Sequence, residues 1–106
     1  MVRELIIPPA AEEDPNAFEI VRVWGAGGVQ HVTLSWDLWD DPATWGIVLA
    51  DLAGHVANAY EQEHRSDRNE ILRKIRDMFN AEFDSPTDVP EGKVHNTRRP
   101  HRREKR

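Results

Sequence analysis

Four polar side chains come closest, by type and spacing, to a catalytic or metal-binding set. They follow one another at i, i+4, i+7 and i+11, so a helix places them in one stripe: Asp51, His55, Asn58 and Gln62. In such a stripe an aspartate can orient a histidine as a general base, or the pair can supply metal ligands. An exposed helix face with an ordinary Asp–His pair explains the same spacing. No second ligand pair at fixed spacing accompanies it, which favours the exposed face.

His31 is a second histidine with a candidate role. On a strand it projects from the same side as Thr33, and a contact with Asp51 or His55 of a second subunit would create an enzyme or metal site. Nothing in the sequence requires that contact, and a surface histidine is the simpler interpretation. The chain also has no cysteine for thiol catalysis or thiolate ligands. We therefore expect a protein without a catalytic site, a metal or a cofactor.

The charge of the chain is divided between an acidic body and a basic tail. Residues 1–92 hold 7 Lys/Arg and 18 Asp/Glu, a net of -11, whereas residues 93–106 hold 7 Lys/Arg and one Glu, a net of +6. Such a tail can bind an anionic partner, either nucleic acid or an acidic protein. It has no aromatic residue to stack on bases, so recognition of a specific single strand is not supported. The candidate anion-binding residues are Lys93, Arg98, Arg99, Arg102, Arg103, Lys105 and Arg106.

Composition limits the class of protein. A chain of 106 residues with 39% hydrophobic content is one small domain. The longest apolar runs are far shorter than the roughly 20 residues of a membrane span. The run Leu5–Ile7 is too short for a signal peptide and is stopped by two prolines. We expect a cytoplasmic protein that does not contact membranes.

Two segments that flank GAGG predict a β-hairpin, residues 17–24 and 29–38. In the second strand the even-numbered residues from Val32 to Leu38 are apolar. A three-residue loop, with Gly25 opposite Val29, brings them onto one face with the even-numbered residues of the first strand. The predicted opposite face carries Val21, Val23, His31 and Thr33.

Two amphipathic helices follow the hairpin. Asp41 is a suitable N-cap and Pro42 a suitable first residue for a helix that extends to about residue 63. Asp67 caps a second helix, which Ser85–Pro86 ends. The stretch WDLWDDPATW, residues 36–45, is then a joint: Trp36 belongs to the buried strand face, and Trp45 to the buried helix face. The predicted apolar stripes are Trp45, Val48, Leu49, Leu52, Val56, Ala59 and Tyr60 on the first helix, and Ile71, Leu72, Ile75, Met78, Phe79 and Phe83 on the second.

These elements predict an α+β fold in which both helices pack on one face of the hairpin. Residues 1–16 form an N-terminal arm, 17–87 a compact domain, and 88–106 a basic tail for which we expect disorder. Two strands make a marginal sheet, so dimerisation or the arm is expected to extend it. We predict a non-catalytic homodimer that serves as an interaction or accessory module. Its predicted surfaces are the edge strands and two groups of residues: Val21, Val23, His31 and Thr33, and Asp51, His55, Asn58 and Gln62.

Three motifs carry a family resemblance: ELIIPPA at residues 4–10, WDDPATWG at 39–46 and HVANAYEQ at 55–62. Through them the chain resembles a small family of bacterial proteins of about a hundred residues, found mainly among alphaproteobacteria and classed as a domain of unknown function. The resemblance covers residues 4–88. It implies a compact bacterial domain and assigns no activity, cofactor or site residue.

Overall fold

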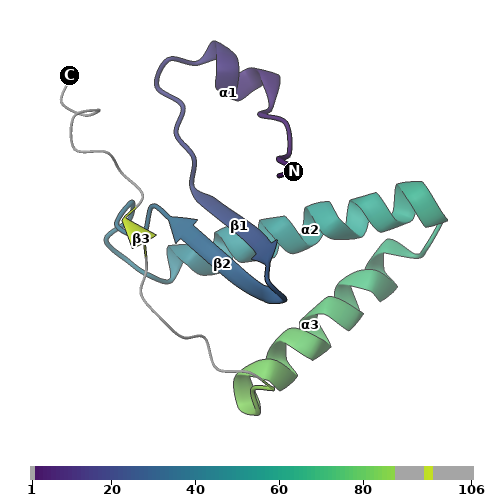
Figure 1. Cartoon of the computed structure of the whole chain (residues 1–106). Coiled ribbons are helices and arrows are strands. Elements are labelled where there is room, and N and C mark those ends of the chain that lie inside the picture. The colour runs from purple at the N-terminus through teal and green to yellow at the C-terminus, as the bar shows by residue number, and fades with distance from the viewer. Residues whose placement is uncertain (1, 88–94, 97–106) are drawn as a thin grey trace. The chain divides into compact units, whose positions relative to one another are not determined.

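The computed structural model describes residues 2–87 and 95–96, which form two compact units. One unit contains residues 2–38 and 95–96 and holds a small β-sheet. The other contains residues 39–87 and holds two long helices (Figure 1). A hairpin followed by two helices confirms the predicted α+β class.

The hairpin pairs β1 (Val21–Ala26) with β2 (Val29–Leu34) in antiparallel fashion. Val21 lies opposite Leu34, and Ala26 lies opposite Val29. The loop therefore contains only Gly27 and Gly28. The predicted three-residue loop, with Gly25 opposite Val29, is wrong by one residue.

The two loop glycines explain this register. Their φ angles are 62° and 78°, and two successive positive φ values are typical of a type I′ turn, whose twist matches that of the flanking strands. The prediction relied on hydrophobic alternation as far as Leu38. However, β2 ends at Leu34, and Trp36 lies in a turn with 63% of its surface exposed. Alternation beyond Leu34 therefore has no bearing on strand pairing, and Trp36 does not continue a buried strand face.

A third strand comes from the C-terminal part of the chain. β3 (His95–Asn96) runs parallel to β2 opposite Thr33 and Leu34, and the sheet order is β1-β2-β3. Residues 2–16 contain no strand. They contain the short helix α1 (Pro9–Glu13) and a turn in which the Asp14 carboxylate accepts the Asn16 amide at 2.9 Å. The arm therefore does not supply the third strand.

Helix α2 (Thr44–His64) begins after a tight turn at residues 41–43. The Asp41 carboxylate accepts the Ala43 amide at 3.0 Å, and the Asp41 carbonyl accepts the Thr44 amide at 3.0 Å. Asp41 thus closes the turn that precedes the helix, whereas the N-cap position is Ala43 and no side chain caps it. The predicted N-cap at Asp41, with Pro42 as the first helical residue, is wrong by two residues. The helix ends at Arg65, whose φ of 55° turns the chain and whose amide donates to the Glu61 carbonyl.

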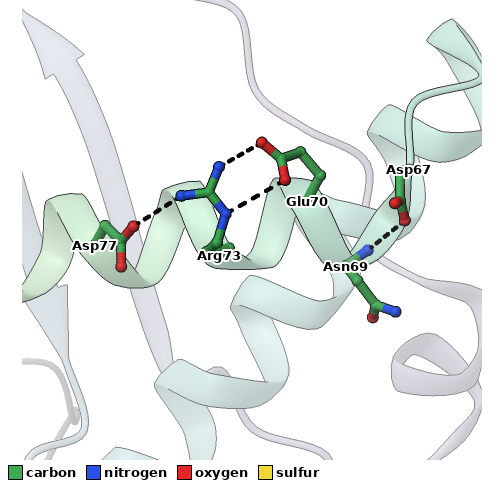
Figure 2. Close-up of polar contacts among 5 residues, drawn as sticks. All are labelled: Asp67, Asn69, Glu70, Arg73 and Asp77. Atoms are coloured by element: carbon green, nitrogen blue, oxygen red, sulfur yellow. Dashed lines mark hydrogen bonds and ion pairs between the residues drawn. The ribbon is translucent and has the colours of Figure 1, made fainter.

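Helix α3 (Arg68–Asp84) is capped as predicted. The Asp67 carboxylate accepts the Asn69 amide at 3.0 Å (Figure 2), and Ser85 terminates the helix. Glu70 does not complete a capping box, because its carboxylate is paired with Arg73 instead. Local sequence therefore predicted both ends of this helix.

Helices α2 and α3 pack near the turn that connects them and separate toward their far ends (Figure 1). The side of α2 that is buried consists of small residues: Ala57 is fully buried, and Ala53 and Gly54 are half-buried. Of the large residues in the predicted stripe, Trp45 and Val48 are half-buried, whereas the others remain exposed: Leu49, Leu52, Val56 and Tyr60. Helix pairs approach closely where side chains are small, so α3 packs on the alanines.

Candidate functional site

The hairpin register divides the first predicted surface between two faces. Residues directly opposite each other in an antiparallel pair project to the same side. Val21 and Val23 therefore share a face with their partners Leu34 and Val32, while His31 and Thr33 share the other face with Trp24 and Arg22. The prediction that these four residues form one face is wrong, because a one-residue change in pairing reverses one strand relative to the other. For the same reason Trp24 is not on the face of Val32 and Leu34.

The face with His31 is polar and aromatic. His31 is exposed, and its Nε2 donates to the Ala26 carbonyl at 3.2 Å. The Arg22 guanidinium lies 5.8 Å from the Trp24 ring centre, in cation–π range. It also forms ion pairs at 2.9 Å with Glu19 and with Glu4 of the arm. The hydrogen bond to Glu19 raises the pKa of Arg22 above its ordinary value. His31 is thus engaged with backbone rather than with a carboxylate.

The polar stripe of α2 does not act as one group. Asp51, His55 and Gln62 are exposed, and in the described part of the chain no hydrogen bond or ion pair joins Asp51 to His55. Asn58 is half-buried, and its Oδ1 accepts a hydrogen bond from Arg68 Nε of α3. Its role is therefore to hold the two helices together. The remaining three side chains form an open polar surface that can contact a partner.

Arg68 is the residue of this site that sequence reasoning missed. Its guanidinium reaches across to α2, where a Cβ built on Gly54 would stand 3.3 Å from Arg68 Nη2. Glycine at position 54 leaves room for this side chain. The signal in the sequence is the run of small residues Ala53, Gly54 and Ala57 on one side of α2, next to the turn that leads to Arg68.

The joint between strand and helix is confirmed in part. Trp39 and Trp45 are half-buried, and their rings meet edge to face with centres 5.3 Å apart. This geometry is favourable for aromatic pairs. Together with the bond from the Ala43 amide to Asp41 in the preceding turn, it accounts for WDDPATW as a helix start rather than a ligand site. Trp36 is exposed and does not join the contact between Trp39 and Trp45.

A second polar group lies on α3. Arg73 bonds Glu70 on one side and Asp77 on the other, the latter at 3.1 Å (Figure 2). The hydrogen bond from Arg73 lowers the pKa of Glu70 below its ordinary value, and bonds to Glu70 raise the pKa of Arg73. All three side chains are exposed, so this group is a surface ion-pair network that supports the helix.

The other predicted sites have no counterpart among the described residues. Residues 2–87 and 95–96 contain no group of three or more His, Asp or Glu placed to hold a metal ion. In the same residues no helix is long and apolar enough to cross a membrane. A shallow depression follows the hairpin turn and is lined by residues 23–30. The basic tail residues, Lys93, Arg98, Arg99, Arg102, Arg103, Lys105 and Arg106, lie outside the described part of the chain.

Comparison with known proteins identifies the family. The model of the domain of unknown function DUF5076 matches residues 4–87, and the chain belongs to this family. No curated protein matches the chain. A solved structure, described as that of "a putative pyruvate dehydrogenase" from the photosynthetic bacterium Rhodopseudomonas palustrus CGA009, is similar with a TM-score of 0.71 and 29% identity. The match covers 91% of this chain and 98% of that one.

Proposed function

We propose that this member of the DUF5076 family is a non-catalytic module that forms a homodimer and serves as an interaction or accessory protein. The observation that carries the proposal is the amount of apolar surface left exposed within each unit. Val23 of β1 and Leu52 and Val56 of α2 are exposed. Among residues 2–87, Ala57 is the only hydrophobic residue that is completely buried. Exposed apolar side chains that neighbour each other, as Leu52 and Val56 do four residues apart on α2, mark a protein contact. A small domain also gains stability when a second copy covers it.

The open edge of β1 supports the same proposal. In the order β1-β2-β3, β1 has a partner strand on one side only among the described residues. The Ser35 amide donates to the Ile20 carbonyl at 2.9 Å, so by alternation Val21 and Val23 direct their backbone groups away from β2. Unpaired edge groups are a template for another strand. A second copy of β1 across a twofold axis would extend the sheet there.

Exposed side chains next to these elements supply the polar part of the surface. Asp51, His55 and Gln62 line one side of α2 and are exposed. Polar residues of this kind surround the apolar centre of a typical interface. On the hairpin, Val21 and Val23 belong to the apolar side of the proposed contact, and His31 and Thr33 belong to the opposite side.

Size-exclusion chromatography with light scattering tests the proposal directly. A homodimer has twice the 12.2 kDa mass of the chain, and its apparent mass falls toward that of the monomer on dilution. The experiment uses the full chain at micromolar concentration. A mass of one chain at every concentration tested would contradict the proposal.

A second candidate function has its support in the charge of residues 93–106. Their net charge of +6 fits an anionic partner, whereas the -11 of residues 1–92 opposes binding of nucleic acid to the body. The test replaces Arg98, Arg99, Arg102 and Arg103 by Gln, which leaves β3 unchanged. Binding of a short DNA duplex or of polyglutamate should be lost in the variant, and in the natural protein it should weaken as salt rises. Affinity that responds to neither treatment excludes the tail.

An enzymatic role for His31, Asp51 and His55 has less support. The dehydrogenase description of the Rhodopseudomonas structure raises such a role, but it applies to that protein. In this chain His31 donates to the Ala26 carbonyl. Within residues 2–87 and 95–96, no side-chain hydrogen bond holds Asp51 or His55 in place. No contact among these residues therefore positions a proton acceptor.

A further inference from the structure

The apolar stripe of α3 extends beyond the part that α2 covers. Ile71, Leu72 and Ile75 are half-buried in the first half of the helix. The stripe continues at helical spacing to Met78, Phe79 and Phe83, whose exposed fractions are 64%, 43% and 72%. The rings of Phe79 and Phe83 contact each other edge to face at 4.7 Å. One half of a continuous apolar surface is thus covered and the other half is open.

The covered half is the contact between α2 and α3. Arg68, in the first turn of α3, bonds Asn58 and lies beside Gly54 of α2. From this point the two helices separate (Figure 1), so the end of α3 that carries Phe83 lies away from α2. The open half is therefore the continuation of an interface that already exists within the chain.

The charges of α3 change sign along its length. Residues 68–76 contain four basic residues and one acidic residue, a net of +3, and residues 77–84 contain three acidic residues and no basic one, a net of -3. This order opposes the helix dipole, which favours acidic residues at the start of a helix and basic residues at its end. An isolated α3 is destabilised by this order, and an adjacent helix that runs in the opposite direction relieves it.

We infer that the open half of α3 packs antiparallel against the same segment of a second copy of this chain. A twofold axis near Phe79 sets Ile75 level with Phe83 of the other copy. The same axis places Lys74 and Arg76 of one copy at the height of Asp84 and Glu82 of the other copy. One helix carries both halves of this complementary pattern, which is why a second copy fits it better than an unrelated partner.

The contact is one part of a dimer interface. Met78, Phe79 and Phe83 together expose on the order of 300 Å². A stable dimer buries about 800 Å² per partner, so other exposed surface contributes the remainder. The inference rests on the proposed self-association and specifies which helix takes part and in which direction.

A pair of matched variants tests the apolar part. Phe83→Glu places a charge in the proposed contact, while Ile47→Glu places the same charge at a comparably exposed position of α2 outside both stripes. By sedimentation, the dissociation constant of the dimer should rise at least about tenfold for Phe83→Glu and little for Ile47→Glu. Equal effects of the two variants would overturn the inference.

Charge reversal tests the direction of the helices and does not depend on Phe83. Lys74→Glu with Arg76→Glu makes both halves of α3 acidic, and Glu82→Lys with Asp84→Lys makes both halves basic. Each double variant alone should dimerise at least about tenfold more weakly than the natural chain, and a mixture of the two should recover dimers that contain one copy of each. Absence of recovery in the mixture would overturn the antiparallel arrangement.

The outcomes separate this inference from the function on which it rests. A natural chain that is monomeric contradicts both. A natural chain that dimerises with the same affinity as Phe83→Glu overturns only the role of α3. If Phe83→Glu lowers the melting temperature of the chain without changing its mass, the stripe is covered within one copy, and the inference is again overturned.

Discussion

At the scale of single residues, acidic side chains at helix starts organise the second unit. Asp41 and Asp67 each accept a backbone amide two residues later, at 3.0 Å. These amides have no partner inside a helix, so an acceptor close by in sequence stabilises the helix start. These backbone bonds explain the positions of both carboxylates, and no ligand site has to be assumed.

Loss of the α3 cap should be measurable. Asp67→Ala removes the acceptor of the Asn69 amide and should lower the free energy of unfolding by about 1 kcal/mol. Asp67→Asn keeps an acceptor and should cost less. Urea denaturation followed by circular dichroism measures both. An Asp67→Asn variant that is no more stable than Asp67→Ala would show that charge, and not the capping bond, is important.

The Glu70–Arg73 pair predicts a pH effect of defined sign. Because bonding to Arg73 lowers the pKa of Glu70 in the folded protein, the pair stabilises the fold above the ordinary pKa of a glutamate. Its contribution disappears as pH falls through the lowered value. Carboxyl titration by NMR should give Glu70 a pKa below the ordinary range of a glutamate, and Arg73→Gln should raise it toward that range. A Glu70 pKa that does not respond to Arg73→Gln would contradict the assignment.

At the scale of elements, turn chemistry outweighed hydrophobic alternation. Gly27 and Gly28 both have positive φ and set a two-residue loop. This register places Val21 and Val23 with Val32 and Leu34, a set of four apolar residues on one side of the sheet. Burial within β2 does not follow the predicted alternation, because Val32, Thr33 and Leu34 are all half-buried. The face that the apolar residues of β2 share with β1 depends on loop length.

A substitution in the loop tests this register. Gly28→Ala puts a Cβ on a residue with φ of 78° and should cost about 1 kcal/mol or more. Gly25→Ala is the matched control, since Gly25 lies in β1 without a positive φ, and a Cβ there meets no atom within 4 Å. Thermal denaturation should separate the two variants. Equal stability would contradict the type I′ turn that the positive φ values of Gly27 and Gly28 indicate.

The glycines of α2 should differ in the same kind of experiment. Gly46→Ala enters open space and should stabilise the chain by about 1 kcal/mol through helix propensity. Gly54→Ala should gain less, because its Cβ would stand 3.3 Å from Arg68 Nη2. In an Arg68→Ala background that difference should disappear. If the difference between the two glycine variants persisted in the Arg68→Ala background, Arg68 would not be the side chain that limits space at Gly54.

At the scale of the whole molecule, each unit leaves apolar surface open to a partner. Proposed self-association links stability to concentration, because a dimer is stabilised by mass action. The melting temperature of the full chain should therefore rise over about a hundredfold increase in protein concentration. Differential scanning calorimetry measures it. A melting temperature that is independent of concentration is the behaviour of a monomer and would contradict the proposal.

The sequence by itself determined the α+β class, both helices, the Asp67 cap of α3 and its end at Ser85. These features depend on residues no more than about four positions apart, whose side chains and backbone amides interact locally. Assignment of residues 17–87 to one compact domain and the packing of both helices on one sheet face remain predictions. The tertiary structure decided which residues share a face. Pairing Val21 with Leu34, and placing α3 on the alanines of α2 with Arg68 bonded to Asn58, involve residues that only folding brings together. Strand pairing shifted by one residue exchanges the two faces, and close helix packing requires small side chains at the contact, so local periodicity did not determine either.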